Sequence, residues 1–98
     1  MAQESTLQYK ILRDLDSLGK HCVAFKILKS SVDGTLDVFF TTVETGPTFI
    51  EVKAPDGTLS VAQENMLKNL NECGCRAFAI WSWQEWVELK RMLFHKLF

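Results

Sequence analysis

The sequence predicts an α/β fold, a mixed β-sheet flanked by helices in the element order α-β-β-β-α-β-α. Segments with helical apolar spacing alternate with short segments rich in β-branched and aromatic residues, which favour strands. A tight turn after residue 43 joins two of these strands as an antiparallel hairpin. A strand, a crossover helix and another strand imply a mixed sheet with helices packed on it.

The first half of the chain is predicted to form one helix and three strands. The helix covers residues 6–18 and ends at Gly19, a residue that suits a helix C-terminus. Its apolar stripe follows spacings of four, four and three residues and consists of Leu7, Ile11, Leu15 and Leu18. The strands cover residues 22–28, 35–43 and 48–54, and the turn signals Asp-Gly and Gly-Pro separate them.

The second half is predicted to form a helix, a strand and a last helix. Ser60, followed three residues later by Gln63, is the capping-box pattern that begins a helix, and Gly74 ends this helix. Its apolar stripe consists of Ala62, Met66, Leu70 and Cys73. A short apolar strand over residues 76–81 comes next, and a helix that begins at Ser82 runs to about residue 97.

The composition is that of an ordinary globular protein. The 98 residues suit one domain, 1–98, and the hydrophobic and charged fractions of 47% and 23% are typical. No apolar run approaches the roughly 18 residues of a membrane span, and the first residues lack the basic and apolar regions of a secretion signal. The three cysteines, an odd count, argue against a disulfide framework and fit a reducing cytoplasm.

Charge and cysteine content also bear on the ligands. The net charge of −1 and the pI of about 6.1 are not typical of nucleic-acid-binding proteins, which are usually basic. A nuclease that uses metal ions brings positive charge to the phosphate, which weakens this objection. Zinc is disfavoured, because a zinc site needs about four ligands. The only side chains typical of zinc are His21, Cys22, Cys73, Cys75 and His95.

The stretch from Asp37 to Lys53 has the pattern most typical of catalysis. Glu51 and Lys53 are two residues apart on one predicted strand, so both project from the same sheet face. If the hairpin folds about residue 45, Asp37 lies opposite the region of Lys53. Two facing carboxylates repel unless one is protonated or a cation lies between them, and hard oxygen ligands favour Mg²⁺ or Mn²⁺. The alternative is a solvated ion pair on an exposed sheet face.

A series of short motifs runs through the same region. They are Gly34-Thr-Leu-Asp-Val-Phe-Phe, Phe49-Ile-Glu-Val-Lys-Ala, Gly57-Thr-Leu-Ser, Gln63 and Gly74. This series resembles the virus-type replication–repair nuclease (VRR-NUC) family of the PD-(D/E)XK superfamily, whose pattern is Gly-x-Pro-Asp, Ile-Glu-x-Lys-Ala, Gly-x-Leu-Ser-x-x-Gln and a later glycine. The resemblance covers about residues 4–86, and Leu36 departs from it, because the family usually has proline there.

The resemblance implies a restriction-endonuclease-like core and a role for each matching residue. Asp37 and Glu51 match the metal ligands, and Lys53 matches the catalytic lysine. The backbone carbonyl of Val52 is an additional candidate ligand. The implied cofactor is Mg²⁺ or Mn²⁺, and the implied activity is endonucleolytic hydrolysis of DNA phosphodiester bonds.

Four further residues are candidates with a second explanation. Gln63 matches the family's helix glutamine near the active centre, and it is equally a capping-box residue. Glu4 matches an acidic residue that related Holliday-junction-resolving enzymes place near the metal, or it is a favourable charge at a helix N-terminus. Lys26 and Lys29 are candidates for contacts with DNA phosphates, and a solvated strand edge explains them equally well.

The resemblance also implies a substrate and a location. Stand-alone members of the family are mostly phage-encoded and resemble junction resolvases, so the implied substrate is branched DNA such as a Holliday junction, and the implied location is the bacterial host cytoplasm. Two alternatives stay open: an inactive DNA-binding or protein-interaction module with a nuclease-like fold, and a plain α/β interaction domain. The intact Asp37, Glu51 and Lys53 argue against the inactive module.

The C-terminal helix predicts a symmetric homodimer. The stripe able to face the sheet consists of Trp86, Leu89, Leu93 and Leu97. A second apolar face consists of Trp83, Val87, Phe94 and Phe98. A helix that is apolar on two faces needs two neighbours, and two-fold association is the commonest way to bury such a surface. The alternative is that the first helix covers this face within one chain.

Overall fold

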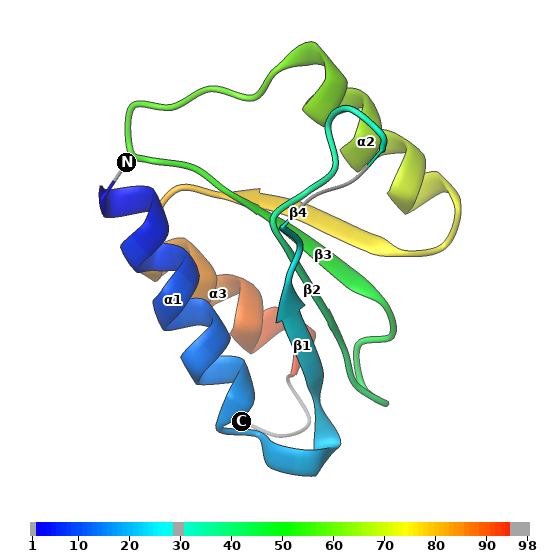
Figure 1. Cartoon of the computed structure of the whole chain (residues 1–98). Helices are drawn as coiled ribbons and strands as arrows, with labels where there is room; N and C mark the ends of the chain where they lie inside the picture. Colours follow the sequence, from blue (N-terminus) through cyan, green and yellow to red (C-terminus); the bar gives the residue numbers. More distant parts are fainter. Residues whose placement is uncertain (1, 29–30, 95–98) are drawn as a thin grey trace.

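The computed structural model describes residues 2–28 and 31–94, which form three layers (Figure 1). Helices α1 (Ala2–Asp16) and α3 (Trp83–Leu93) lie on one side of a central sheet, and α2 (Val61–Glu72) lies on the other. Within the described residues, no helix has the length and apolar character needed to cross a membrane.

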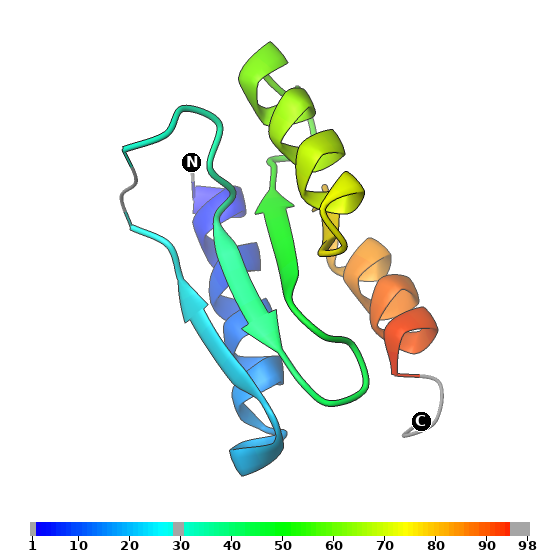
Figure 2. The ribbon, with the colours of Figure 1, turned by 90° about the vertical axis from the view of Figure 1, so that its right-hand side faces the viewer.

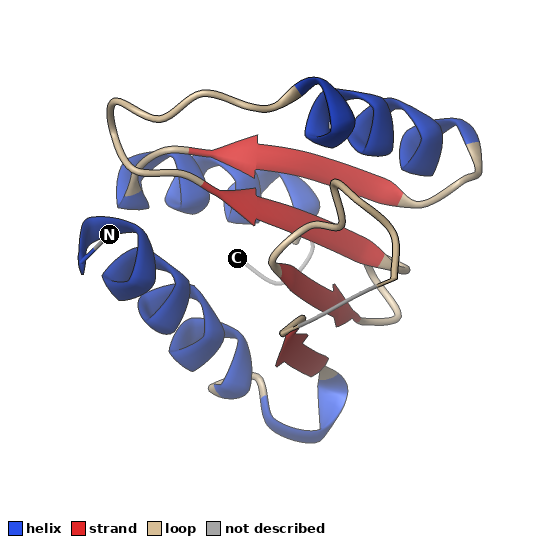
Figure 3. Cartoon of the chain, turned by 45° about the horizontal axis from the view of Figure 1, so that its top comes forward, coloured by secondary structure: helices blue, strands red, loops and turns tan. Residues whose placement is uncertain are grey.

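Four strands lie in the order β1-β2-β3-β4 across the sheet. They are β1 (Val23–Lys26), β2 (Val38–Thr41), β3 (Thr48–Val52) and β4 (Arg76–Ile80). The first three strands pair antiparallel, whereas β3 and β4 run parallel (Figure 3). Because α2 connects the two parallel strands, the predicted element order and mixed sheet are confirmed. A short 3₁₀ helix, η1 (Gly19–His21), additionally leads from α1 toward β1.

The hairpin between β2 and β3 has shorter strands and a longer turn than predicted. Of the strand predicted over residues 35–43, only Val38–Thr41 forms β2, and Asp37 just before it adds a backbone hydrogen bond to Ile50 at 3.1 Å. Thr42 leaves the ladder because its hydroxyl oxygen accepts a hydrogen bond from the backbone N–H of Thr45 at 3.0 Å. Gly46 then adopts a φ of 67°, a value that glycine reaches without strain. These local bonds decide where the strands separate.

The main core lies between the sheet and the helices α1 and α3. The sheet residues that are fully buried there are Val38, Phe40, Ile50 and Val52. The helices contribute Leu7, Ile11, Leu15, Trp86, Leu89 and Leu93. Figure 2 shows α1 behind β1, β2 and β3, and α1 contacts all three strands. Because alternate strand residues fill this core, the remaining residues of β2 and β3 point to the opposite face, where α2 lies.

Helix α2 packs more superficially than its predicted apolar stripe implied. None of the described residues of α2 is buried, and Cys73 at its end is exposed. The helix lies over β4, which presents the small side chains of Ala77 and Ala79 on this face. Asn71 fixes the contact, because its amide donates to the carbonyl of Ala77 at 3.0 Å and its Oδ1 accepts from the Ala77 N–H at 3.1 Å. Hydrogen bonds from the Asn71 side chain to the backbone of β4 therefore replace part of the apolar contact expected between α2 and the sheet.

The side chain of Asp14 joins α1 to α3. Its Oδ2 accepts a hydrogen bond from the indole Nε1 of Trp86 at 2.8 Å. The Nζ of Lys90 lies 3.0 and 2.9 Å from the two oxygens of the same carboxylate. Because Trp86 is fully buried, its indole N–H depends on Asp14 for a hydrogen-bond acceptor.

Asp14→Ala is therefore expected to lower the free energy of unfolding by about 1–3 kcal/mol, the cost of leaving a buried donor without an acceptor. Denaturant unfolding at neutral pH measures this loss. Asp16→Ala is the matched control, because Asp16 is exposed at the end of the same helix; it should stay within about 0.5 kcal/mol of the wild type. Equal losses in the two variants would show that the Asp14 contacts do not stabilise the helix pair.

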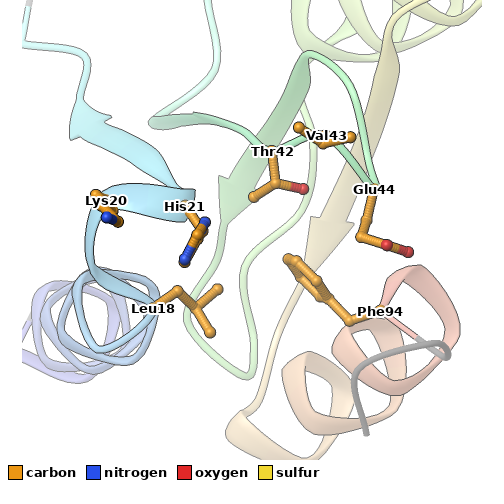
Figure 4. A pocket seen from close by; sticks show the side chains of 7 residues that line it. All are labelled: Leu18, Lys20, His21, Thr42, Val43, Glu44 and Phe94. Carbon is orange, nitrogen blue, oxygen red and sulfur yellow. The ribbon is translucent and has the colours of Figure 1, made fainter.

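The assignment of Phe94 to an exposed face of the last helix is wrong. Phe94 is fully buried, and its ring stacks on Phe40 with the centroids 6.2 Å apart. Helix α3 ends at Leu93, so Phe94 has non-helical φ and ψ and does not follow the helical spacing that the prediction used. Figure 4 shows its ring beside Thr42, at a cavity of about 420 Å³ between η1, the β2–β3 turn and the end of α3.

Less of the predicted second face is therefore exposed. Trp83 is 39% exposed, and Val87 is half-buried. Leu97 and Phe98, also part of the predicted apolar surfaces, lie outside the described residues. The exposed apolar surface of α3 is thus narrower than the sequence predicts, with Trp83 and Met92 as its largest exposed side chains.

Candidate active site

Asp37 and Glu51 lie next to each other on neighbouring strands, on the sheet face opposite the main core. In the antiparallel ladder Val38 pairs with Ile50, so one step further along places Asp37 beside Glu51. The prediction that Asp37 lies opposite Lys53 is therefore wrong by two residues. The hairpin is centred on residue 44, midway between the paired Val38 and Ile50, instead of residue 45.

Hydrogen bonds hold both carboxylates in place. The Oδ2 of Asp37 accepts the backbone N–H of Val52 at 2.9 Å, which fixes it across the strand pair. The Oε2 of Glu51 accepts a hydrogen bond from the Nε2 of Gln63 at 2.8 Å and lies 3.6 Å from the Nζ of Lys53. Glu51 is only 2% exposed. Its second oxygen, Oε1, is buried and has no hydrogen-bond partner in the part of the chain that the structure describes.

This environment raises the pKa of both acids. Burial, followed by the charge of Asp37, raises the pKa of Glu51 to about 7, and the charge of Lys53 only partly opposes this. Burial also raises the pKa of Asp37, whereas the hydrogen bond from Val52 lowers it. The charge of Glu4 on α1 raises the pKa of both acids, so Glu4 lies close enough to interact with the pair. A cation between the carboxylates would reverse these shifts.

The raised pKa of Glu51 predicts how stability depends on pH without metal. Between its ordinary value of 4.5 and about 7, folded Glu51 holds a proton that the unfolded chain releases. The folded state then binds more protons than the unfolded state, so stability falls as pH rises through this window. Glu51→Gln should remove this part of the slope. Urea unfolding in a chelator at about pH 5 and about pH 7.5 measures it, and identical slopes in both proteins would contradict the raised pKa.

Gln63 forms the capping box that the sequence predicts, and its side chain also reaches Glu51. Its backbone N–H donates to the Oγ of Ser60 at 3.0 Å, and its Oε1 accepts the backbone N–H of Ser60 at 3.0 Å, which completes the capping box. The same side chain donates from Nε2 to Glu51. The cap therefore fixes the amide so that its N–H groups point toward the carboxylate, and the first turn of α2 is tied to β3.

Three residues outside the predicted site build its walls. The indole Nε1 of Trp81 donates to the carbonyl oxygen of Gly57 at 2.8 Å and so fixes the loop that follows Lys53. Gly34 has a φ of 82°, and a Cβ there would overlap the backbone of Ala62 at the start of α2. Both glycines belong to the quoted motifs, but no local pattern marks Trp81, because its partner lies 24 residues away.

The remaining predicted site residues are less closely connected. Glu4, at the start of α1, is half-buried and acts on the carboxylate pair through its charge. Lys26 is exposed at the end of β1, where Ile27 hydrogen-bonds to Asp37. Lys29 lies outside the described residues. The structure thus brings together Asp37, Glu51, Lys53 and Gln63, with the backbone of Val52.

The donor set fits a hard divalent cation. Two adjacent carboxylates supply charged oxygens, and the buried Oε1 of Glu51 lacks a partner that a cation would provide. No group of three or more Asp, Glu, His or Cys side chains among the described residues is arranged to hold a metal. The pair would therefore need the carbonyl of Val52 and water as further ligands, an arrangement usual for Mg²⁺.

A mixed sheet with helices on both faces and a carboxylate pair on its central hairpin defines a PD-(D/E)XK restriction-endonuclease-like core. The VRR-NUC domain matches residues 4–82, and the chain belongs to this nuclease-related family. A solved VRR-NUC domain has a similar fold, with a TM-score of 0.76 and 17% sequence identity over 94% of this chain and 97% of that chain. A comparison with curated proteins found no match.

Proposed function

We propose that this chain is a metal-dependent DNA endonuclease that hydrolyses phosphodiester bonds. The observation that carries the proposal is the buried, unpartnered Oε1 of Glu51 beside Asp37. A buried carboxylate pair lowers stability through desolvation and repulsion, so its presence in the fold needs a compensating function. Membership of the nuclease-related VRR-NUC family supports catalysis as that function.

Mg²⁺ or Mn²⁺ is the proposed cofactor. Asp37, Glu51 and the carbonyl of Val52 would hold it, and Glu4 would contribute through a bound water. The bound cation would supply Lewis-acid polarisation of the phosphodiester and a water of lowered pKa. The hard carboxylate oxygens and the charge of Glu4 near the pair support this assignment.

Lys53 and Gln63 act around the carboxylate pair. The ammonium of Lys53, 3.6 Å from Glu51, brings positive charge to an otherwise acidic site. There it orients the attacking water or stabilises the charge that develops on the phosphate in the transition state. Gln63 occupies one oxygen of Glu51 through its amide N–H, which leaves the other oxygen available.

The proposed substrate is branched DNA such as a Holliday junction, with Lys26 and Lys29 as candidate contacts to phosphates. The test compares a labelled four-way junction, a flap and a blunt duplex, each with Mg²⁺, with Mn²⁺ and with a chelator. We expect cleavage only with a cation and faster cleavage of the branched substrates. If neither cation supports cleavage of any of the three, the chain is a non-catalytic module and the proposed activity is wrong.

We also propose that the protein works as a symmetric homodimer through the C-terminal helix. The exposed Trp83 and Met92 on α3 support an interface there, although the buried Phe94 leaves less apolar surface than predicted. Two-fold symmetry would place two sites on opposite strands of a junction. Light scattering at micromolar concentration should give twice the 11.2 kDa chain mass. Trp83→Ser should reduce the measured mass to that of a single chain. A single-chain mass under conditions of paired cleavage would exclude the dimer.

The cysteines support a reducing cytoplasm, such as that of a bacterial host, as the place of action. Cys22, Cys73 and Cys75 are free thiols. Cys73 and Cys75 flank Gly74, which has a φ of 92° just after the end of α2. The two cysteines therefore belong to the segment that terminates this helix.

A further inference from the structure

A row of three phenylalanines crosses the sheet on the face that carries the carboxylates. Phe25 pairs with Phe39, and Phe39 pairs with Phe49, on three successive strands. Both pairs of neighbouring rings have centroids 5.1 Å apart. Phe25 is 52% exposed, and the other two rings are half-buried. Helix α2 packs on β4, which lies at the opposite edge of the sheet from β1 and Phe25.

The aromatic row lies directly alongside the proposed catalytic residues. Phe39 follows Asp37 by two residues on one strand, and Phe49 precedes Glu51 by two residues on the next. Residues two apart share a sheet face and are separated by about 6.6–6.8 Å along the strand. This separation is comparable to that between a phosphate and the base of the same nucleotide. A phosphate at the carboxylates would therefore have its base, or that of its neighbour, over the rings.

We infer that the aromatic row stacks unpaired bases next to the scissile phosphate, so that among branched DNAs the enzyme prefers those with unpaired nucleotides at the branch, such as a flap, to a fully paired four-way junction. The inference rests on the proposed nuclease function of the same site. Paired bases inside a duplex are already stacked on their neighbours, so only unpaired bases can lie on protein rings. Exposed aromatic side chains on a sheet are a known kind of stacking platform, and such stacking tolerates any base.

A second copy of the chain fits this surface less well than nucleobases do. A protein seated on the aromatic row would cover the face from which Glu51 and Lys53 reach the substrate, because these residues continue the same face of β3. Three rings, of which only Phe25 is more than half exposed, are also a small part of the roughly 800 Å² per partner that a standard interface buries. Unpaired bases, by contrast, would use the row and the site together.

The test measures binding without cleavage, so that it does not depend on catalysis. A fluorescently labelled oligothymidylate and a blunt duplex of equal length are titrated with protein in a chelator and followed by anisotropy. Wild type should prefer the single strand. Phe25→Ala and Phe25→Leu should each weaken single-strand binding roughly ten- to hundredfold, the usual effect of losing one stacking ring, whereas Phe25→Trp should keep it. Duplex binding should change little in all three.

Val43→Ala is the control, because Val43 is a fully exposed apolar residue in the turn at the other end of β2; it should bind like wild type. Phe25→Trp gives a second readout, since stacked bases should quench its added fluorescence even if the alanine variant folds poorly.

Equal single-strand affinity of wild type, Phe25→Ala and Phe25→Leu would overturn the inference. The inference would also be overturned if the Phe25 variants changed the mass of the protein in solution without changing its affinity for single-stranded DNA. That result would assign the aromatic row to contact with a second copy of the chain. Loss of cleavage with this binding pattern intact would instead count against the proposed activity alone.

Discussion

Lys53→Ala is expected to slow metal-dependent DNA cleavage by about 10²–10³, the usual effect of removing one preorganised electrostatic group from an active site. Lys53 lies on the same strand as Glu51, and its Nζ is 3.6 Å from the Glu51 carboxylate. Its side chain is 17% exposed, so water screens its charge only weakly. The variant should fold normally, because the strand on which it lies is fixed by backbone bonds and by the core on the opposite face. Single-turnover cleavage of a branched DNA measures the effect.

Lys68→Ala is the control for this substitution. Lys68 is an exposed lysine on α2, and removing it changes the net charge by the same amount. Its cleavage rate should remain within a few-fold of wild type. If Lys53→Ala cuts DNA as fast as Lys68→Ala, then Lys53 is only one half of an ion pair with Glu51, and such pairs near a surface contribute roughly 0–1 kcal/mol.

Asp37→Asn is expected to abolish the stabilisation of the protein by Mg²⁺ or Mn²⁺. A cation that binds only the folded state adds about 2.7 kcal/mol at one hundred times its Kd, and each kcal/mol raises the Tm of a domain this size by about 4–8 °C. Asparagine keeps an oxygen that can accept the Val52 N–H, so the strand contact survives. Without metal the variant should be more stable than wild type, because repulsion with Glu51 is gone.

Asp56→Asn is the matched control for Asp37→Asn. Asp56 is an exposed carboxylate in the loop after β3. Its replacement by asparagine changes the net charge by the same amount as Asp37→Asn and leaves Asp37 and Glu51 intact. Thermal unfolding with and without cation should give the wild-type shift in Asp56→Asn and no shift in Asp37→Asn. An equal response of the two variants would show that the cation binds elsewhere on the protein.

Local patterns in the sequence predicted most of the elements and the sheet face on which the candidate site residues lie. The alternation of Glu51, Val52 and Lys53 correctly separates the carboxylate face from the core face, because strand side chains alternate. The spacing of Ser60 and Gln63 correctly predicts the start of α2. The family resemblance implied only that Gln63 lies near the active centre, and its hydrogen bond to Glu51 was not predicted, since a capping pattern does not say what the free amide N–H meets.

What the sequence could not predict depends on contacts between distant residues. The register of the hairpin follows from side-chain bonds of Thr42 and Thr45 in the turn, and a shift there moves Asp37 from Lys53 to Glu51. The burial of Phe94 follows from where α3 ends, which helical spacing does not report. The aromatic row joins three strands, so it becomes visible only when their pairing is known.

The most direct test of the central claim is the cleavage of one branched DNA by wild type and Glu51→Gln, purified side by side, in Mg²⁺ and in a chelator. Glutamine keeps the shape of Glu51 and can still meet Gln63, but it removes the charge that would hold a cation. We expect wild type to cut only with Mg²⁺, and Glu51→Gln to lose that cleavage while it remains folded. Cleavage by Glu51→Gln at the wild-type rate would contradict the assignment of Asp37, Glu51 and Lys53 as a metal-dependent nuclease centre.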